Sequence, residues 1–462
     1  MLSDIIAAVS TPRGTGGIAV IRISGAGAVE LAGKVFRPKS GKSILEYKPR
    51  FAIYGDISDD VSTIDSGILT YFLSPASYTG EDMVEISCHG GYTVTSMVLS
   101  AVLEKGARMA EGGEFTRRAF INNKIGLTEA EAVGNMLTAD SQRAVRLSNR
   151  HINGALKAKT DAISERLISL ISSLYASIDY PEEDLEDMED VDLISGINLL
   201  RQECEHLIET YRSGHAVAHG ISTVIVGKTN VGKSSFFNAL ISEKKAIVTD
   251  IPGTTRDVLE QLVEIDGIAL RVFDTAGIRD NTDDVIESMG IEIAREKMHA
   301  DETELILALF DSSRALDESD KSLIQSLASL AETKTVIPVL TKCDEERKAD
   351  ISEIENTLGQ VYCISCLKGD GIGELKNEII HRFLTCESDV ESGAVITNVR
   401  QQSTLKKCVD ILNRAEELIL SGMKDMSLIE LENAANTVGE IDSRTVAERI
   451  VNEIFSKFCV GK

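Results

Sequence analysis

The sequence predicts a multidomain α/β protein in which an α+β N-terminal domain precedes a helical domain, and a P-loop nucleotide-binding domain is inserted into that helical domain. Three observations support this prediction. A strand–loop–helix pattern surrounds Gly227-Lys-Thr-Asn-Val-Gly232-Lys233-Ser234. Helical periodicity lies on both sides of it, in residues 127–213 and after about residue 382. Residues 1–118 mix strand-like runs with glycine turns. The expected segments are residues 1–118, 119–216, 217–384 and 385–462.

The bulk composition narrows the classes of partner and compartment. The 462 residues carry a formal net charge of −25, which makes the chain a poor general binder of nucleic-acid phosphates. If RNA is involved, a partner or a small local patch must supply the contact. No apolar run approaches the ~20 residues of a membrane span, and the eight cysteines are scattered. We therefore expect a cytoplasmic protein with no membrane segment and no disulfide framework.

In the N-terminal domain, three segments have the composition of β-strands. They are Gly17–Ser24, Asp65–Phe72 and the alternating Met83–Cys88. His89-Gly90-Gly91 follows the third of these, and a helix is expected from there through Leu103. This is an α+β pattern, and physical reasoning alone assigns it no ligand.

Between residues 127 and 213, apolar residues recur at steps of three and four, which predicts long packed helices. One such stripe consists of Ile163, Leu167, Leu170, Ile171 and Leu174. Further on, His215 and His219 lie four residues apart, but Ala216 stands where a zinc protease has its glutamate. We interpret this stretch as a linker.

The P-loop pattern predicts a phosphate site. Its glycines allow successive N–H groups to point at one anion, at a helix N-terminus that already favours negative charge. Lys233 is expected to contact the β- and γ-phosphates, and the Ser234 hydroxyl to hold Mg²⁺. The nucleotide contacts expected from this stretch are Asn230, Val231, Gly232, Lys233, Ser234 and Ser235.

Two further motifs follow the P-loop helix. The first is Asp250-Ile-Pro-Gly-Thr-Thr-Arg-Asp257; the second, Asp274-Thr-Ala-Gly277, follows a hairpin turned at Asp266-Gly267. Asp274 is placed for a water-mediated contact with Mg²⁺, and Thr255 is the natural second hydroxyl on that ion. The nucleotide contacts expected here are Thr249, Asp250, Ile251, Pro252, Gly253, Thr254, Thr255, Asp274, Thr275, Ala276 and Gly277.

Two later strands end in loops that resemble the guanine-reading loops of GTPases, which usually read Asn-Lys-x-Asp and Ser-Ala-Lys. Asp344 can accept two hydrogen bonds from guanine that adenine cannot offer. Thr341 replaces the usual asparagine, and losing one neutral hydrogen bond costs about 0.5–1.5 kcal/mol. We therefore expect somewhat weak nucleotide binding. The contacts expected here are Thr341, Lys342, Asp344, Ser365 and Cys366.

Efficient hydrolysis needs a source of positive charge and a group that orients water. Ile278 follows the second motif and can orient no water, and no arginine finger is evident in the sequence. Such a finger is worth about 10³–10⁵ in rate. The Asn230 amide oxygen and the carbonyls of residues 249–254 suit a hard monovalent cation, and Glu287 is the nearest later acid with suitable neighbours.

Taken together, these motifs resemble the MnmE family (also called TrmE) of tRNA-modifying GTPases over the whole chain. P-loops occur in many families, but the tail of this chain together with its N-terminal motifs does not. The motifs outside the P-loop domain are Thr11-Pro12…Gly16-Gly17…Arg22-Ile-Ser-Gly25, Ser77-Tyr-Thr-Gly-Glu-Asp82, His89-Gly-Gly91, Gly113-Glu-Phe-Thr-Arg-Arg-Ala-Phe120 and Phe458-Cys-Val-Gly-Lys462.

The resemblance implies a Ras-like G domain and an N-terminal domain that binds tetrahydrofolate and dimerises. It implies Mg²⁺ at Ser234 and Thr255, and catalytic roles for Glu287, Lys233 and Cys459, although a structural role for Cys459 stays open. The implied potassium ligands are Asn230, Thr249, Ile251 and Thr254. The implied folate contacts are Arg22, Glu85, Lys124 and Lys462.

The resemblance also implies partners and a reaction. A homodimer would join an FAD-dependent partner (MnmG/GidA) in a heterotetramer, and that partner would supply most of the tRNA contact. The pair would use 5-formyl- or 5,10-methylene-tetrahydrofolate to add an aminomethyl or carboxymethylaminomethyl group at C5 of the wobble uridine. FAD belongs to the partner alone, and glycine and ammonium both stay open as the amine.

Two other functions remain as alternatives. One is an Era-like GTPase of ribosome assembly, although no basic RNA-binding domain is evident in a chain with a pI of about 4.8. The other is a folate-binding aminomethyltransferase that carries a GTPase-like module, which predicts activity without nucleotide turnover.

Overall fold

The computed structural model describes residues 4–12, 14–179, 190–241, 260–273, 296–442, 451, 454–455 and 458–461. The chain divides into two units, here called unit 1 (Met1–Gly134 with Asn436–Lys462) and unit 2 (Asn135–Ala435). The predicted segment boundaries after residues 118, 216 and 384 stay predictions.

Unit 1 is built on a seven-stranded sheet of order β3-β4-β5-β6-β2-β1-β7. Its pairs are antiparallel except for β1 and β7, which run parallel. The three strands predicted in this region are confirmed as β2, β5 and β6. The bounds are β1 (Ile6–Val9), β2 (Ile18–Ser24), β3 (Phe36–Pro38), β4 (Ile53–Ser58), β5 (Thr63–Phe72), β6 (Met83–His89) and β7 (Arg108–Met109).

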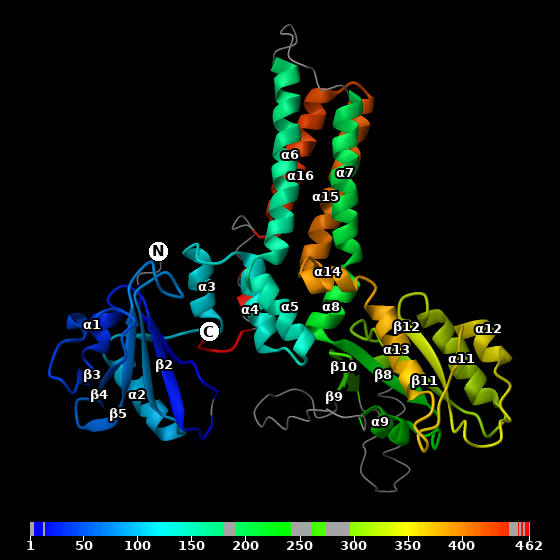
Figure 1. Ribbon diagram of the computed structural model, residues 1–462, viewed down its shortest axis with the longest axis horizontal. Helices are drawn as coiled ribbons and strands as arrows, with labels where there is room; N and C mark the ends of the chain where they lie inside the picture. Colours follow the sequence, from blue (N-terminus) through cyan, green and yellow to red (C-terminus); the bar gives the residue numbers. More distant parts are fainter. Residues whose placement is uncertain are drawn as a thin grey trace. The chain divides into compact units, whose positions relative to one another are not determined.

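The helices α1 and α2 cover one face of this sheet, and their apolar side chains share a core with the strands (Figure 1). On the other face, Ile6 and Ala8 of β1 pack against Phe115 of α3. Because side chains alternate along a strand, Ile21 and Ile23 enter the core under α1 and α2 while Arg22 lies on the opposite face. The helical elements that begin in unit 1 are α1 (Ala28–Ala32), the 3₁₀ turn η1 (Ile44–Glu46), α2 (Tyr92–Glu104), α3 (Glu114–Ile121) and α4 (Leu127–Leu137).

The C-terminal residues are part of unit 1. The Phe455 ring lies 6.2 Å from the Phe120 ring of α3 and 5.5 Å from the Phe458 ring. Beyond Phe458, the backbone N–H of Gly113 donates to the Cys459 carbonyl at 3.3 Å. Aromatic packing therefore holds the chain end beside the start of α3.

Unit 2 contains a six-stranded sheet of order β13-β12-β11-β8-β10-β9, parallel except for the hairpin β9–β10. The predicted hairpin turn is confirmed: Asp266 and Gly267 both have positive φ, at 47° and 79°. The bounds are β8 (Ile221–Gly227), β9 (Glu260–Ile265), β10 (Ile268–Phe273), β11 (Leu305–Asp311), β12 (Thr335–Thr341) and β13 (Tyr362–Cys363).

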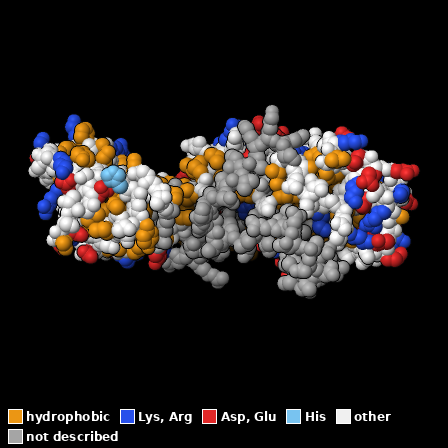
Figure 2. Space-filling view, turned by 90° about the horizontal axis from the view of Figure 1, so that it is seen from below, with side chains coloured by type: hydrophobic (Ala, Val, Ile, Leu, Met, Phe, Trp, Pro, Cys, Tyr) orange, Lys and Arg blue, Asp and Glu red, His pale blue; other side chains and the backbone are white. Residues whose placement is uncertain are grey.

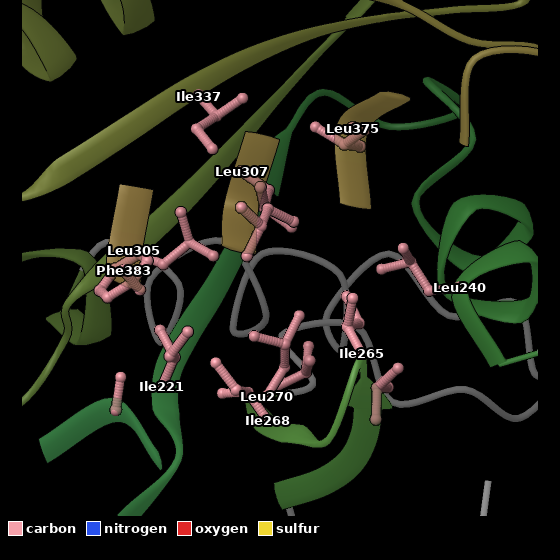
Figure 3. Close-up of a cluster of buried hydrophobic side chains, with 14 of the residues drawn as sticks. Ile221, Leu240, Ile265, Ile268, Leu270, Leu305, Leu307, Ile337, Leu375 and Phe383 are labelled. Carbon is pink, nitrogen blue, oxygen red and sulfur yellow. The ribbon is translucent and has the colours of Figure 1, made fainter. Parts of the chain in front are cut away.

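Both faces of this sheet are covered. Figure 3 shows the core on one face, where side chains of the strands meet Leu240 of α9 and Leu375 and Phe383 of α13. The other face packs against α11 and α12. The bounds are α9 (Lys233–Ile241), α11 (Glu318–Leu330), α12 (Ser352–Leu358) and α13 (Ile372–Phe383).

The helical part of unit 2 is assembled from segments before and after this sheet, which confirms the predicted insertion. The helices α6, α7, α15 and α16 run side by side (Figure 1), and Arg201 of α7 bonds Glu416 of α15 at 2.6 Å. The bounds are α5 (Gln142–Ile152), α6 (Ala155–Asp179), α7 (Asp190–Glu209), α8 (Tyr211–His219), α14 (Glu387–Ser392), α15 (Val399–Leu420) and α16 (Lys424–Gly439).

The inserted segment begins and ends at one place. The Ser213 hydroxyl, in α8, accepts hydrogen bonds from the backbone N–H groups of Thr385 and Cys386 at 3.0 and 3.2 Å. The polypeptide therefore leaves the helices for the sheet and returns to them at adjoining points.

Two helical predictions have different outcomes. Four residues of the predicted stripe in α6 are buried, and Ile171 is half-buried. The linker predicted at His215 and His219 is wrong, because these residues lie in α8. Ala216 and Val217 explain this helix, since both are fully or almost fully buried in the core beneath the sheet.

Within the described part of the chain, none of the helices combines the length and the apolar character needed to cross a membrane.

Arg118 provides a test of what holds unit 1 together. Its guanidinium is 1% exposed and contacts Glu81, Glu114 and both the carbonyl and the carboxylate of Asp4 at 2.9–3.1 Å. Arg118→Met leaves Glu81 without this cation, while Asp4 and Glu114 keep their ion pairs with Arg108. Breaking a buried pair costs about 3–5 kcal/mol, and we expect the low end of that range because Arg108 remains. We expect unit 1 to unfold at lower urea and the amides of β1 to exchange faster.

The matched control is Arg37→Ala, an exposed arginine on β3. It should change the free energy of unfolding by no more than about 0.5 kcal/mol. Equal stability of the two variants would show that the Arg118 cluster does not stabilise unit 1.

Candidate functional site

The P-loop connects β8 to α9 and has the backbone that its glycines predict. Gly227, Asn230 and Gly232 have φ values of 154°, 60° and 97°. A Cβ atom added at Gly227 would lie 2.7 Å from the Leu309 carbonyl, so β11 approaches too closely for any other residue. The Lys233 ammonium donates to the carbonyls of Gly227 and Lys228, both at 2.9 Å. The Lys233 side chain therefore lies against the backbone of its own loop.

A hydrogen bond joins the P-loop to residues 341–344, the first of two loops expected to contact the guanine base. These are called here the base-reading loops, and the second is residues 365–368. Thr341 ends β12, and its buried hydroxyl lies 2.6 Å from the Val231 carbonyl and 3.1 Å from that of Phe310. Through the shorter bond, Thr341 links the two loops directly. The sequence alone did not predict this contact. Whether the missing asparagine weakens nucleotide binding stays a prediction.

Asp344 lies in the same loop and is positioned by the second base-reading loop. The Ser365 hydroxyl donates to its Oδ1 at 2.7 Å and in turn accepts from the Lys368 backbone N–H at 3.2 Å. The bond from Ser365 lowers the pKa of Asp344 below its usual value. Because the shift is downward, the carboxylate stays an acceptor at neutral pH and into acid. The ammonium of Lys342 lies 2.7 Å from Asp311.

Lys228 is a P-loop residue that the sequence did not single out. Its ammonium pairs with Asp317, the N-cap of α11, and lies 3.3 Å from Asp320. The bond from Lys228 lowers the pKa of Asp317 to about 2. Arg314 also contacts Asp320, at 2.8 Å. Acidic and basic side chains are mixed over this end of unit 2 in Figure 2. The Asp317–Asp320 capping box is the sequence feature from which the start of α11 could have been predicted.

Many of the predicted contacts fall outside the described residues. They are Thr249, Asp250, Ile251, Pro252, Gly253, Thr254, Thr255, Asp274, Thr275, Ala276, Gly277, Glu287 and Lys462. Their roles remain predictions.

In unit 1, Arg22 and Glu85 lie directly opposite each other on β2 and β6. Arg22 donates from Nε and Nη2 to Glu85 Oε1 at 3.0 and 2.8 Å. Its guanidinium lies 5.5 Å from the ring centre of Tyr78 and 5.6 Å from that of Phe115. The Tyr78 hydroxyl is 2.8 Å from Thr116 Oγ1, and burial raises the pKa of Tyr78. Sequence reasoning missed both rings, although each lies inside a quoted motif.

Two other predicted residues of unit 1 lie in the described part of the chain, Lys124 and Cys459. Lys124 donates to the Pro75 carbonyl at 3.0 Å. The Cys459 thiol is exposed, and its backbone is bonded to Gly113 next to α3, the helix that carries Phe115. The Ser10 hydroxyl donates to the Gly461 carbonyl at 2.8 Å. Gly461 has a φ of 103°, and a Cβ atom there would lie 2.3 Å from a carbonyl of β1.

Comparison with known proteins gives the family. A model of the GTP-binding protein TrmE N-terminus matches residues 5–124, and one of the MnmE helical domain matches residues 127–459. Two relatives, each called "tRNA modification GTPase MnmE", come from Clostridioides difficile (39% identical over 467 residues, all of both chains) and Acetivibrio thermocellus (37% over 464 residues, 99% of each). The chain belongs to the MnmE family.

As a member of the MnmE family, it is a GTP hydrolase, and its family is that of the tRNA modification GTPases. The assignment displaces both alternatives left by the sequence. A solved structure of Era with MgGDPNP and 16S ribosomal RNA nucleotides is 30% identical but covers 35% of this chain and 55% of its own, with a TM-score of 0.27. That partial likeness carries no argument about function.

The tie at Thr341 leads to a prediction about nucleotide affinity. Thr341→Val removes the hydroxyl that reaches the Val231 carbonyl but keeps the β-branched shape. Losing one neutral hydrogen bond costs about 0.5–1.5 kcal/mol, so the Kd for a fluorescent GDP analogue should rise by about 2- to 10-fold. Thr341→Ser keeps the hydroxyl and should bind as the parent does. A folded Thr341→Val protein with unchanged affinity would contradict the role given to this contact.

Proposed function

We propose that the protein is a potassium-dependent GTPase that works with an FAD-dependent partner (MnmG/GidA). Together they would use a one-carbon tetrahydrofolate to add an aminomethyl or carboxymethylaminomethyl group at C5 of the tRNA wobble uridine. The observation that supports this best is the combination of two sites in one chain. One joins a P-loop to guanine-reading loops, and the other sets Arg22 and Glu85 beside two aromatic rings. Glycine and ammonium both stay open as the amine.

The nucleotide site has donors that suit two hard cations. The Ser234 side chain is exposed in the first turn of α9, and that of Asn230 is exposed in the loop before it. Hydroxyl, amide and carbonyl oxygens are the ligands that Mg²⁺ and other hard cations prefer. Ser234 and Thr255 would hold Mg²⁺; Asn230, Thr249, Ile251 and Thr254 would hold K⁺. When bound, such cations neutralise the negative charge that develops on the phosphates. Glu287 would orient the attacking water, and Lys233 would contact the phosphates.

The second site fits the chemistry of a folate. Arg22 supplies a cation on the sheet face opposite α1 and α2, and both of its bonds to Glu85 end on one carboxylate oxygen. A pterin offers N–H donors to a carboxylate and a flat ring to the half-buried Tyr78. Phe115 is fully buried and would support the Arg22 guanidinium. Lys124 and Lys462 would meet the acidic tail of the ligand, 5-formyl- or 5,10-methylene-tetrahydrofolate. Cys459 would act chemically or help to place the tail.

Exposed apolar side chains on β4 and β5 support a homodimer through unit 1. Tyr54 and Ile68 are paired across β4 and β5, with 58% and 45% of their surface exposed. Ile68 also lies opposite Ser87, in the row beside Glu85. Exposed apolar rows next to polar groups are typical of interaction sites. The net charge of −25 leaves most tRNA contacts to the partner enzyme in the heterotetramer. We expect this assembly in the cytoplasm.

Potassium dependence can be measured directly. Turnover in KCl should exceed turnover in NaCl at equal ionic strength by at least about tenfold, because the charge it replaces is worth 10³–10⁵ in rate. Asn230→Ala should lose this preference while its GDP affinity is followed separately. Equal rates in the two salts, or a potassium preference that survives Asn230→Ala, would rule out the proposed site.

The tail tests the link to tRNA modification. Gly461→Val should displace the tail, because a side chain there meets a backbone carbonyl of β1. In a strain without the native gene, we expect this variant to lose wobble-uridine modification, measured by nucleoside mass spectrometry. It should also bind 5-formyl-tetrahydrofolate weakly and keep potassium-stimulated GTPase activity. Truncation after Lys457 should do the same.

The matched control is Val460→Ala, since this neighbour is 49% exposed. It should keep modification near the parent level. If folded Gly461→Val protein modifies tRNA as well as Val460→Ala does, the tail has no part in the reaction.

A further inference from the structure

Two cysteines lie side by side where the base-reading loops begin. Cys363 is in β13, opposite Leu340 of β12. Three residues after Leu340, the Cys343 backbone N–H donates to the Ile364 carbonyl at 3.1 Å. The strand pairing thus brings Cys343 and Cys363 to one edge of the sheet. The Cys343 thiol lies 3.2 Å from the carbonyl of Leu340, the residue opposite Cys363.

This pair differs from the other cysteines of the chain in its exposure. Of the eight cysteines, Cys343, Cys363 and Cys459 are exposed, and Cys459 belongs to unit 1. By contrast, Cys204 of α7 and Cys408 of α15 are fully buried. An oxidant in solution therefore reaches the first pair and is kept from the second.

Both cysteines lie close in sequence to residues that shape the nucleotide site. Cys343 directly precedes Asp344, the expected guanine acceptor, and Cys363 lies two residues before Ser365, which donates to Asp344 at 2.7 Å. The two sulfurs must approach to about 2.05 Å to form a disulfide. Such a bond would pull one base-reading loop against the other and disturb the Ser365–Asp344 contact.

We propose that Cys343 and Cys363 are a site of reversible thiol oxidation that controls the affinity for guanine nucleotides. Hydrogen peroxide oxidises the Cys363 sulfur to a sulfenic acid and releases one water. The Cys343 sulfur then attacks the Cys363 sulfur and displaces a second water. Two thiols thus lose two electrons and two protons, and one peroxide becomes two waters. A dithiol reductant reverses the reaction.

The chemistry of Cys343 indicates this order of steps. Although the residue is exposed, partial burial of its sulfur and the nearby Cys363 thiol hold the pKa of Cys343 above its usual value. A raised pKa leaves little thiolate to meet peroxide, so Cys343 acts as the second, resolving thiol. Bound nucleotide should protect the pair, because coupling between two sites is reciprocal.

The test uses the full-length protein, reduced and then treated with hydrogen peroxide with or without excess GDP. Peptide mass spectrometry should find Cys343 joined to Cys363, less often when GDP is present. The Kd for a fluorescent GDP analogue should rise by about tenfold or more, as expected for a disturbed bond to a charged group. Dithiothreitol should restore it.

Two variants complete the test. Cys363→Ser should make nucleotide affinity insensitive to peroxide, whereas Cys386→Ser, a half-buried cysteine of the same unit, should leave the response intact. The proposal is overturned if no Cys343–Cys363 peptide forms, if it forms without a change in affinity, or if Cys363→Ser still responds. Since it needs only guanine-nucleotide binding, none of these results bears on tRNA modification.

Discussion

The nucleotide site depends on one short hydrogen bond, from the Thr341 hydroxyl to the Val231 carbonyl. This bond joins the end of β12 to the loop that begins α9, and so fixes the distance between the part of the site that meets the base and the part that meets the phosphates. The neighbouring contacts have the same character. Ser365 holds Asp344, and Lys228 ties the P-loop to α11. Each of these described loops is thus tied by a side-chain contact to another element.

In unit 1, the pleat of the sheet positions the side chains of the candidate ligand site. Alternation along β2 sends Ile21 and Ile23 into the core and leaves Arg22 on the opposite face, next to Glu85 of β6. The position of Arg22 is therefore fixed by the burial of its two neighbours. Behind this sheet, the Arg118 cluster joins the first residues of the chain to α3, the helix beside which the tail is docked. α3 therefore contributes both to the candidate ligand site and to the stability of unit 1.

Local patterns in the sequence predicted three of the seven strands of unit 1, the P-loop, the hairpin and the insertion, because periodicity and turn residues act over a few positions. Contacts between distant residues were not predictable in this way. Thr341 and Val231 are 110 positions apart, and Lys228 and Asp317 are 89 apart. The linker expected at His215 and His219 failed for a related reason: a pair of histidines looked like a break, while the apolar Ala216 and Val217 between them pack under a sheet that forms later in the chain.

The Ser213 hydroxyl bridges the two ends of the inserted segment, and this has an evolutionary consequence. A segment whose first and last residues share one hydrogen-bonding side chain can be gained or lost in a single recombination event, because the helices on either side keep their spacing. An ancestral helical protein could therefore have folded with a short loop in place of 170 or so residues, on the order of one ordinary domain. The nucleotide switch would then be a later acquisition, grafted onto a bundle that already stood by itself.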